Sequence, residues 1–134
     1  MTSSNSAAAN KALVSKVMDA VFVRRDSNVV EQHFDKGYIQ HNPKIPNGRD
    51  AISALISQLP AGFRYESGMI VAEGDLVMIH GRFSGFGQPT AWIVTDILRV
   101  ADSVLTEHWD VIQDEATRES SKSGLPMFGE KFGG

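Results

Sequence analysis

The second half of the chain holds four strand-like segments that are joined by very short links. The segments cover residues 64–73, 76–85, 90–100 and 104–113, and the links are residues 74–75, 86–89 and 101–103. Parallel strands need a crossover of a dozen residues or more, so links this short allow only antiparallel neighbours. The sequence therefore predicts an antiparallel sheet in this half of the chain.

The pattern before these strands is helical. Apolar side chains recur at helical spacing after Asn10, which is expected to cap a helix that ends near Arg25. Pro43 and Pro46 exclude helix from the stretch GYIQHNPKIPNG and force extended or turn backbone there. Helical segments are thus expected at residues 10–25, 29–34 and 49–58.

Helices that precede a run of antiparallel strands are typical of an α+β fold. We expect a cone-shaped, curved and mainly antiparallel sheet wrapped around the N-terminal helices. A chain of 134 residues supports one core. A single domain is therefore expected at residues 10–128, between a disordered tail at 1–9 and a flexible tail at 129–134. An apolar patch near the end of the domain is expected to fold back as a flap over the pocket, in the same chain or in a partner's: Leu125, Met127 and Phe128.

The composition narrows the kinds of partner. A net charge of -3 with scattered basic residues argues against nucleic acid, and no apolar run is long enough to span a membrane. The first ten residues lack the basic and apolar regions of a secretory signal, so a cytoplasmic protein is expected. The absence of cysteine excludes disulfides, thiolate zinc sites and cysteine nucleophiles. A small-molecule ligand is therefore a better expectation than nucleic acid.

A curved sheet leaves an open end that can hold such a molecule if its inner face carries polar groups. In the strand at 90–100, alternation places Asp96 in an apolar row with Trp92 and Leu98. In the strand at 104–113, the same alternation puts His108 and Asp110 on one face, together with Thr106 and Ile112. The opposite face of that strand carries Leu105, Glu107, Trp109 and Val111.

Two orientations of this last strand matter for function. If Trp109 lies on the convex side, its apolar neighbourhood suits a partner subunit, while His108 and Asp110 point into the cone. A β-bulge would invert this parity. The sequence favours a homodimer, or a higher homo-oligomer, that associates through the convex face of the sheet.

Asp96 and Asp110 are the candidates for acid/base chemistry. Burial in an apolar pocket disfavours the charged carboxylate and raises its pKa, which brings a carboxyl group closer to useful general-base strength. The two aspartates could divide acid and base duties, or one could orient a histidine. The structural alternative for Asp96 is a buried salt bridge with Arg82 or Arg99, or a loop cap.

The remaining candidates are rings and amides near the expected pocket. No pair of the four histidines shows the spacing of metal ligands, so no metal site is expected. His41, in the proline-bounded loop beside Tyr38, is interpreted as a hydrogen-bonding residue at the pocket rim. His80 alternates with Met78 and Arg82 and suits a hydrogen-bonded position in the core or on a sheet face better, and Trp92 with Phe86 could shape an aromatic ligand site. The glycines in HGRFSGFGQP fit a bulge or wide turn, not a dinucleotide-binding motif.

Four stretches together carry a family resemblance: YIQHNP, VAEGDLVMIHGRF, TDILRV and EHWDVIQ. Over about residues 13–128 the chain resembles the SnoaL-like polyketide cyclase family, in particular its branch of predicted aldol-condensation enzymes, within the nuclear-transport-factor-two-like superfamily. The resemblance implies a cystatin-like cone with a hydrophobic pocket and usually a dimer. It also implies ring closure by intramolecular aldol condensation without metal or cofactor, with Asp110 as the matching acid/base residue. The relatives have a histidine fourteen positions earlier, where this chain has Asp96.

The expected function is therefore acid/base chemistry on a hydrophobic carbonyl substrate. Asp110 would remove a proton next to a carbonyl, and Asp96 or His41 would bind the enolate oxygen. Further substrate-binding positions are expected at Tyr38, Asn42, His80, Trp92, His108 and Phe128. One alternative is an epoxide hydrolase like the limonene-epoxide type, although alternation places Arg99 opposite the two aspartates. The other is a non-catalytic module for small-molecule binding or assembly.

Overall fold

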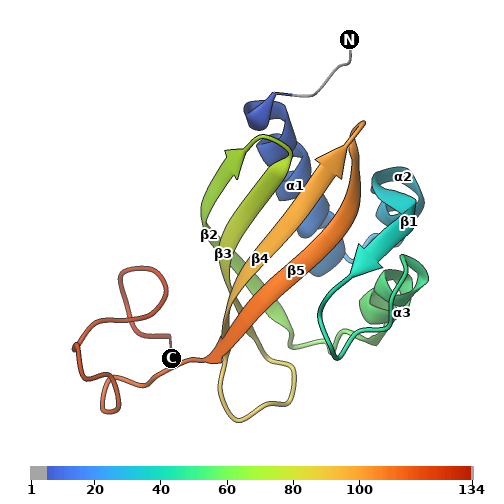
Figure 1. Ribbon diagram of the computed structural model, residues 1–134. Coiled ribbons are helices and arrows are strands. Elements are labelled where there is room, and N and C mark those ends of the chain that lie inside the picture. Colours follow the sequence, from blue (N-terminus) through green and yellow to red (C-terminus); the bar gives the residue numbers. More distant parts are fainter. Residues whose placement is uncertain (1–5, 134) are drawn as a thin grey trace.

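A computed structural model describes residues 6–133 of the chain. Helix α1 spans Ala7–Phe22 and crosses the concave face of the sheet (Figure 1). Its cap is Ser6, whose hydroxyl accepts a hydrogen bond from the Ala9 amide at 3.1 Å, so the prediction that Asn10 caps this helix is wrong. Asn10 is instead buried within the helix, where its side chain donates to the Gly74 carbonyl at 3.3 Å.

Both ends of α1 differ from the prediction. Residues 7–9 of the predicted disordered tail are helical, and residues 1–5 lie outside the described residues. At the other end, the helix stops at Phe22 because the backbone turns, with Arg25 in the left-handed region at a φ of 55°. The Arg25 guanidinium donates to the carbonyls of Leu59 and Pro60, which anchors this turn.

Two shorter helices lie beside the first strand. Helix α2 spans Asn28–His33 and helix α3 spans Asp50–Gln58, in agreement with the predicted segments. Each buries a pair of aliphatic side chains in the core: Val29 and Val30 from α2, and Ile52 and Ile56 from α3. Figure 1 shows the two helices next to β1, at the edge of the sheet away from β2.

The sheet has five strands in the order β1-β5-β4-β3-β2. The four predicted strands are confirmed within about two residues at each end, and they pair as antiparallel neighbours. Strand β1 was not predicted, and it pairs with β5 in parallel. The strands are β1 Phe34–Gln40, β2 Arg64–Glu73, β3 Leu76–Ser84, β4 Trp92–Ala101 and β5 Val104–Asp114.

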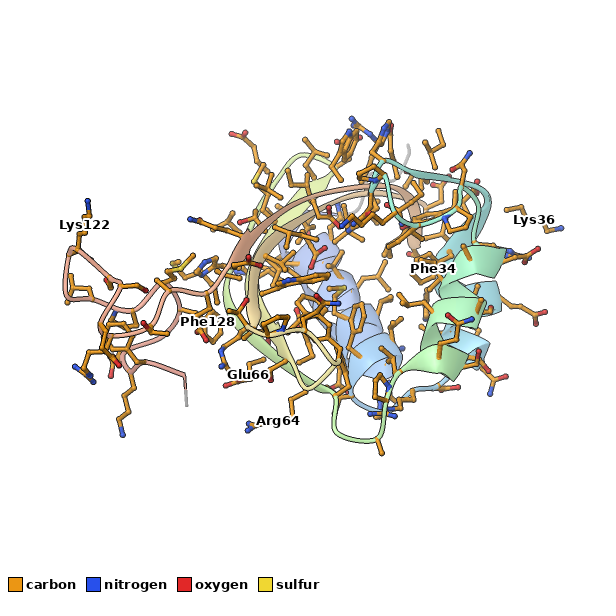
Figure 2. The ribbon with its side chains drawn as sticks, turned by 90° about the horizontal axis from the view of Figure 1, so that it is seen from below. Phe34, Lys36, Arg64, Glu66, Lys122 and Phe128 are labelled. Carbon is orange, nitrogen blue, oxygen red and sulfur yellow. The ribbon has the colours of Figure 1, made fainter. Side chains whose placement is uncertain are left out.

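The sheet curves around α1, so that its inner face and the helices enclose the core (Figure 2). The predicted α+β class, with a curved and mainly antiparallel sheet around N-terminal helices, is confirmed, and the sheet is not closed into a barrel. Among the described residues, no helix is long and apolar enough to cross a membrane. The most deeply buried side chains come from helix and sheet alike: Val14, Val17, Val77, Ile79 and Leu105.

A bulge in β5 corrects one predicted side-chain direction. Arg99 pairs with Glu107, but the next residue, Val100, pairs with Leu105, so β5 carries one extra residue at Thr106. Leu105 therefore turns inward and is fully buried, whereas its predicted place was the outer face. Beyond the bulge, His108 and Asp110 keep the predicted inward direction.

The C-terminal segment does not close over the concave side. Residues 115–133 contain neither helix nor strand and loop out beyond the end of β5 (Figure 1). Phe128 returns to the outer face and fills the space above Gly68, where a Cβ atom would lie 2.9 Å from the Phe128 ring. The predicted flap over the pocket is therefore wrong for this chain. The predicted flexible tail at 129–134 stays a prediction, and residue 134 lies outside the described residues.

Candidate active site

A cavity of about 210 Å³ lies between the concave face of the sheet and the helices. Its lining is apolar except for one group of polar side chains contributed by β1, the loop that follows it, β4 and β5. Among the lining residues that the structure describes there is no lysine or arginine. The polar members of the lining, apart from the indole of Trp92, are Tyr38, Gln40, Asn42, Asp96, His108 and Asp110.

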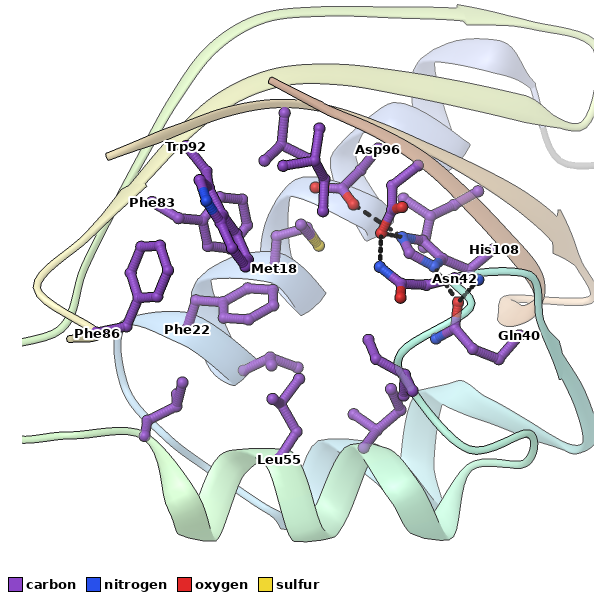
Figure 3. A pocket seen from close by; sticks show the side chains of 18 of the residues that line it. Met18, Phe22, Gln40, Asn42, Leu55, Phe83, Phe86, Trp92, Asp96 and His108 are labelled. Carbon is purple, nitrogen blue, oxygen red and sulfur yellow. Dashed lines mark hydrogen bonds and ion pairs between the residues drawn. The ribbon is translucent and has the colours of Figure 1, made fainter. Parts of the chain in front are cut away.

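The polar and aromatic residues occupy opposite ends of this pocket (Figure 3). At one end Asp96, His108 and Gln40 gather under the sheet. At the other end the rings of Phe86 and Trp92 lie 4.5 Å apart, and those of Phe22 and Phe83 lie 5.0 Å apart in an edge-to-face contact. The pocket thus has a polar end for chemistry and an aromatic end that fits a ring.

Strand alternation explains why these side chains meet. Asp96 pairs with Asp110 in the antiparallel register of β4 and β5, and His108 is the next inward residue along β5. Gln40 pairs with His108 across the parallel register of β1 and β5. The sheet itself therefore holds the charged groups at fixed spacing, without dependence on a loop.

His108 is bound on both ring nitrogens. Its Nε2 atom lies 2.8 Å from Oδ1 of Asp96 and 3.8 Å from Oδ2 of Asp110, and its Nδ1 atom lies 2.7 Å from Oε1 of Gln40. The ring is 8% exposed, so these contacts take place largely out of water. This arrangement matches the option, left open by the sequence, that an aspartate orients a histidine.

Asn42 fixes the carboxylate of Asp110. The Asn42 side-chain oxygen accepts from the Lys44 amide at 2.8 Å, which leaves its NH₂ group to donate to Oδ2 of Asp110 at 2.7 Å. No hydrogen bond engages Oδ1 of Asp110 within the described part of the chain. Asp110 therefore has one oxygen held in place and one available to a ligand.

Burial shapes the protonation of the other two acidic groups. Desolvation raises the pKa of Asp96, and the hydrogen bond from His108 opposes this rise. The second oxygen of Asp96 is buried and has no hydrogen-bond partner among the described residues. Burial also raises the pKa of the Tyr38 hydroxyl, which accepts a hydrogen bond from the Gln40 amide at 3.2 Å. An uncharged Asp96 is thus the state that this environment favours.

Six of the predicted site residues line the pocket. Asp96, Asp110 and His108 come together at its polar end with Tyr38 and Asn42, and Trp92 lies at the aromatic end. The suggested salt bridge from Asp96 to an arginine does not form. Arg82 pairs with Glu66 and Glu115, and Arg99 pairs with Asp75 and Glu107.

The predicted place of His41 at the pocket is wrong. Gln40 and Asn42 point inward, so alternation sends the residue between them to the outer face. There the His41 ring stacks on Trp109 at 4.9 Å, and its Nε2 atom lies 2.7 Å from the Glu107 carboxylate. His41 is therefore too far from the polar end to bind an enolate oxygen.

His80 and Phe128 also lie outside the pocket. Ile79 and Gly81 are buried on the inner face of β3, so His80 between them points outward. Its ring contacts Phe128, with 5.5 Å between the ring centroids. Both predicted pocket positions are wrong, and the sequence suggested as much for His80, because it alternates with Met78 and Arg82.

The sequence analysis missed Gln40 and most of the aromatic end. Glutamine is usually exposed, so nothing in its type points to a site. The alternation of Tyr38, Gln40 and Asn42 is the signal that could have found it once an extended strand was assigned there. The aromatic residues Phe22, Phe63 and Phe83 come from α1, from the link before β2 and from β3, respectively, and only the tertiary fold brings them together.

The polar end has the residue types of a metal site. Ligand atoms of Asp96, His108 and Asp110 all lie within 4.8 Å of one another. However, Nε2 of His108 and Oδ1 of Asp96 already bind each other at 2.8 Å. A metal ion would have to replace this hydrogen bond, so the geometry fits proton sharing better than ligation.

The sequence profile of the SnoaL-like domain matches residues 14–108, which include every strand except most of β5. No curated protein matches the sequence. The matched part covers well over half of the chain and contains Asp96 and His108, while Asp110 lies just beyond it.

Solved structures with a similar fold include proteins of several activities. A candidate ketosteroid isomerase from Kribbella flavida has a TM-score of 0.71 at 16% identity, over 92% of this chain and 95% of its own. A candidate polyketide cyclase from Bacillus cereus has a TM-score of 0.66 at 17% identity, over 78% and 74%. An LEH-like epoxide hydrolase from M. tuberculosis has a TM-score of 0.67 at 17% identity, over 88% and 90%. At these identities the likeness concerns the fold.

Proposed function

We propose that this chain, which belongs to the family of SnoaL-like domains, catalyses acid/base chemistry next to a carbonyl group of a neutral hydrophobic substrate. One observation carries the proposal. The carboxylate of Asp110 and the hydrogen-bonded pair of Asp96 and His108 gather at one end of an otherwise apolar pocket. Acid and base groups with different surroundings, side by side in a closed site, are the pattern that proton-transfer enzymes use.

Asp110 takes the role of general base. Asn42 holds Oδ2, and Oδ1 is free to accept a proton from the carbon next to the substrate carbonyl. The electron pair of the broken C–H bond moves into the carbonyl to give an enolate. The matching position of Asp110 to the acid/base aspartate of the polyketide cyclases supports this role.

Asp96 and His108 act together as the proton donor. Their shared proton lies between Oδ1 and Nε2 at the polar end, where it can stabilise the negative oxygen that develops. In an aldol condensation the enolate carbon attacks a second carbonyl of the same substrate. The resulting alkoxide takes the proton shared by Asp96 and His108, and return of the substrate proton from Asp110 to that pair restores the site. His108 thus fills the place that the sequence assigned to His41.

The pocket favours an uncharged substrate with a ring. No lysine or arginine lines it in residues 6–133, so a carboxylate or phosphate on the ligand would meet Asp96 and Asp110 without one of these counter-charges. The rings of Phe86 and Trp92 offer apolar faces at the opposite end. A ring system held there would place a carbonyl at its other end near Asp110.

Epoxide hydrolysis receives less support from the same pocket. That reaction, in the form weighed from the sequence, needs an arginine beside two aspartates. Arg99 lies on the outer face in ion pairs with Asp75 and Glu107. A binding module without catalysis would leave the pocket intact, and it would bind a ketone without exchanging its protons.

Proton exchange tests the proposal directly. A panel of neutral ring ketones is incubated with the protein in D₂O, and loss of the protons next to the carbonyl is followed by NMR. Exchange faster than in buffer is expected for ketones that bind, and matched ketones without such protons serve as binding controls. Binding without exchange throughout the panel would favour the binding module.

We further propose that copies of the chain associate through the outer face of the sheet. An apolar row crosses four strands there, since Val71 pairs with Met78, Met78 with Ile97, and Ile97 with Trp109. Val71 is 60% exposed and Met78 is 40% exposed. A continuous apolar row of this kind is typical of a surface that a partner covers.

A further inference from the structure

We infer that Gln40 is a positioning residue that fixes the tautomer of His108, so that the pair of His108 and Asp96 holds one transferable proton. This inference rests on the proposed function for the meaning of that proton. The tautomer itself is a property of the protein without substrate. Gln40 does not need to touch the substrate to have this effect.

The orientation of the Gln40 amide follows from its neighbours. The backbone N–H of Asn42 donates to a Gln40 side-chain atom at 3.0 Å, and a backbone N–H can only donate. That atom must therefore be the oxygen, Oε1. The NH₂ group then points to the Tyr38 hydroxyl at 3.2 Å, which accepts. If the amide rotated by half a turn, its NH₂ group would face the Asn42 N–H and that hydrogen bond would be lost, so the backbone of Asn42 fixes the orientation.

The same oxygen decides where His108 carries its hydrogen. Oε1 of Gln40 lies 2.7 Å from Nδ1 of His108, and an amide oxygen cannot donate. Nδ1 therefore carries a hydrogen in every protonation state that keeps this contact. All changes of protonation must then occur at Nε2, the nitrogen that faces Asp96.

A single proton is enough to complete the hydrogen bond between His108 and Asp96. Nε2 of His108 and Oδ1 of Asp96 lie 2.8 Å apart, so the proton sits either on the carboxyl group or on the ring. Burial favours the uncharged pair, with the proton on Asp96. Without Gln40, the ring could instead hold its hydrogen on Nε2 beside an ionised Asp96. The pair of His108 and Asp96 would then no longer hold its proton in one defined arrangement.

The groups that surround the His108 ring come from several elements of the fold. Asp96 comes from β4, Asp110 from β5 at 3.8 Å, and Tyr38 from β1. Tyr65 of β2 is a further titratable group nearby, and the charge of Asp96 contributes to the raised pKa of Tyr65. Helices α1 and α3 contribute only apolar side chains to the pocket lining. Among these described neighbours of His108, Gln40 is therefore the one neutral group that distinguishes Nδ1 from Nε2.

Nitrogen-15 NMR of the imidazole groups tests the inference in the full-length protein. Of the four histidines, the signals of His108 are assigned by their loss in His108→Gln, and spectra are recorded where the ring is neutral. The wild type is expected to show Nδ1 protonated and Nε2 unprotonated. In Gln40→Met the Nδ1 signal is expected to shift toward the unprotonated range, while the exposed control Lys36→Gln leaves it unchanged.

A second variant keeps the inference open to refutation if Gln40→Met fails to fold. Gln40→Glu retains an acceptor oxygen, so it should keep the Nδ1–H tautomer of the wild type. A wild-type Nε2–H tautomer would overturn the inference, as would an unchanged His108 spectrum in folded Gln40→Met or loss of the Nδ1–H tautomer in folded Gln40→Glu. If the tautomer responds but no ketone exchanges its protons, the proposed function fails and the role of Gln40 stands.

Discussion

His108 and Asp96 share a hydrogen bond of 2.8 Å between Nε2 and Oδ1 while both residues are nearly removed from water, at 8% and 5% exposure. A buried carboxylate without a strong cation is costly, so the environment favours a neutral pair. Asp110 on the same strand as His108 has an oxygen open to the pocket. The site therefore combines a pair that can hold a transferable proton with a group that can receive one.

The raised pKa of Asp96 predicts a pH-dependent stability. The carboxyl group binds its proton more tightly in the folded protein than in the unfolded chain, where the pKa is about 3.9. Its stabilising contribution is complete below that pKa and is lost as the pH rises through the folded-state pKa. The free energy of unfolding of the wild type should thus fall relative to Asp96→Asn above about pH 4, by up to about 1.4 kcal/mol per pH unit.

Urea unfolding of both proteins between pH 4 and 8 measures this difference in the free energy of unfolding. Its slope against pH should be on the order of the limit for a single proton. Asp114→Asn serves as the matched control, because Asp114 lies at the exposed end of β5. A constant difference between wild type and Asp96→Asn over the whole range would contradict the assignment.

Both tyrosines of the chain should resist ionisation while the protein is folded. Burial raises the pKa of Tyr38 and of Tyr65, so each hydroxyl stays protonated where an exposed tyrosine would ionise, near pH 10. The stability that this provides is present below about pH 10 and is lost above it as the pH rises through the folded-state values. Tyrosinate absorbance should therefore appear together with the loss of the β-sheet circular dichroism signal. Gradual ionisation near pH 10 in a folded protein would count against the buried positions.

The two tryptophans should report ligand binding differently. Trp92 lies at the aromatic end of the pocket, whereas Trp109 stacks on His41 at the outer face. A ring ketone that enters the pocket should change the fluorescence of wild type and of Trp109→Phe, and the change should disappear in Trp92→Phe. An equal response in both variants would place the ligand elsewhere.

A charge in the apolar row should disrupt self-association. Met78 lies in the middle of this row, so Met78→Glu is expected to shift the protein toward monomer in sedimentation velocity runs. Leu125→Glu is the control, because Leu125 is 67% exposed in the C-terminal segment. A wild-type protein that stays monomeric at all concentrations would contradict the proposed interface.

Much of the sheet could be predicted because its links are short and its inner and outer residues alternate. Alternation in β4 placed Asp96 in the apolar row correctly, and β5 gave His108 and Asp110 the right face. Strand β1 escaped prediction because Asp35, Lys36 and Gly37 interrupt its strand-forming residues and because it pairs with β5, some seventy positions away along the chain. Pairing at that distance leaves no local signal.

The errors at the site have the same origin. With β1 taken as a loop, His41 seemed as close to the pocket as its neighbours, although alternation sends it outward. Gln40 was overlooked for the same reason. The apolar character of Phe128 indicates that its side chain packs against the domain, but it does not indicate against which surface. The space above Gly68 on the outer face is the surface that Phe128 covers.

The most direct test of the central claim compares two aspartates of β5. Asp110→Asn and Asp114→Asn carry the same substitution, one inside the pocket and one at the exposed end of the strand. Rates of proton exchange next to the carbonyl of a bound ring ketone are measured in D₂O for both variants and the wild type. Loss of a general base should slow Asp110→Asn by about 10²- to 10⁴-fold and leave Asp114→Asn at the wild-type rate. Exchange at the wild-type rate in folded, ketone-binding Asp110→Asn would contradict the account.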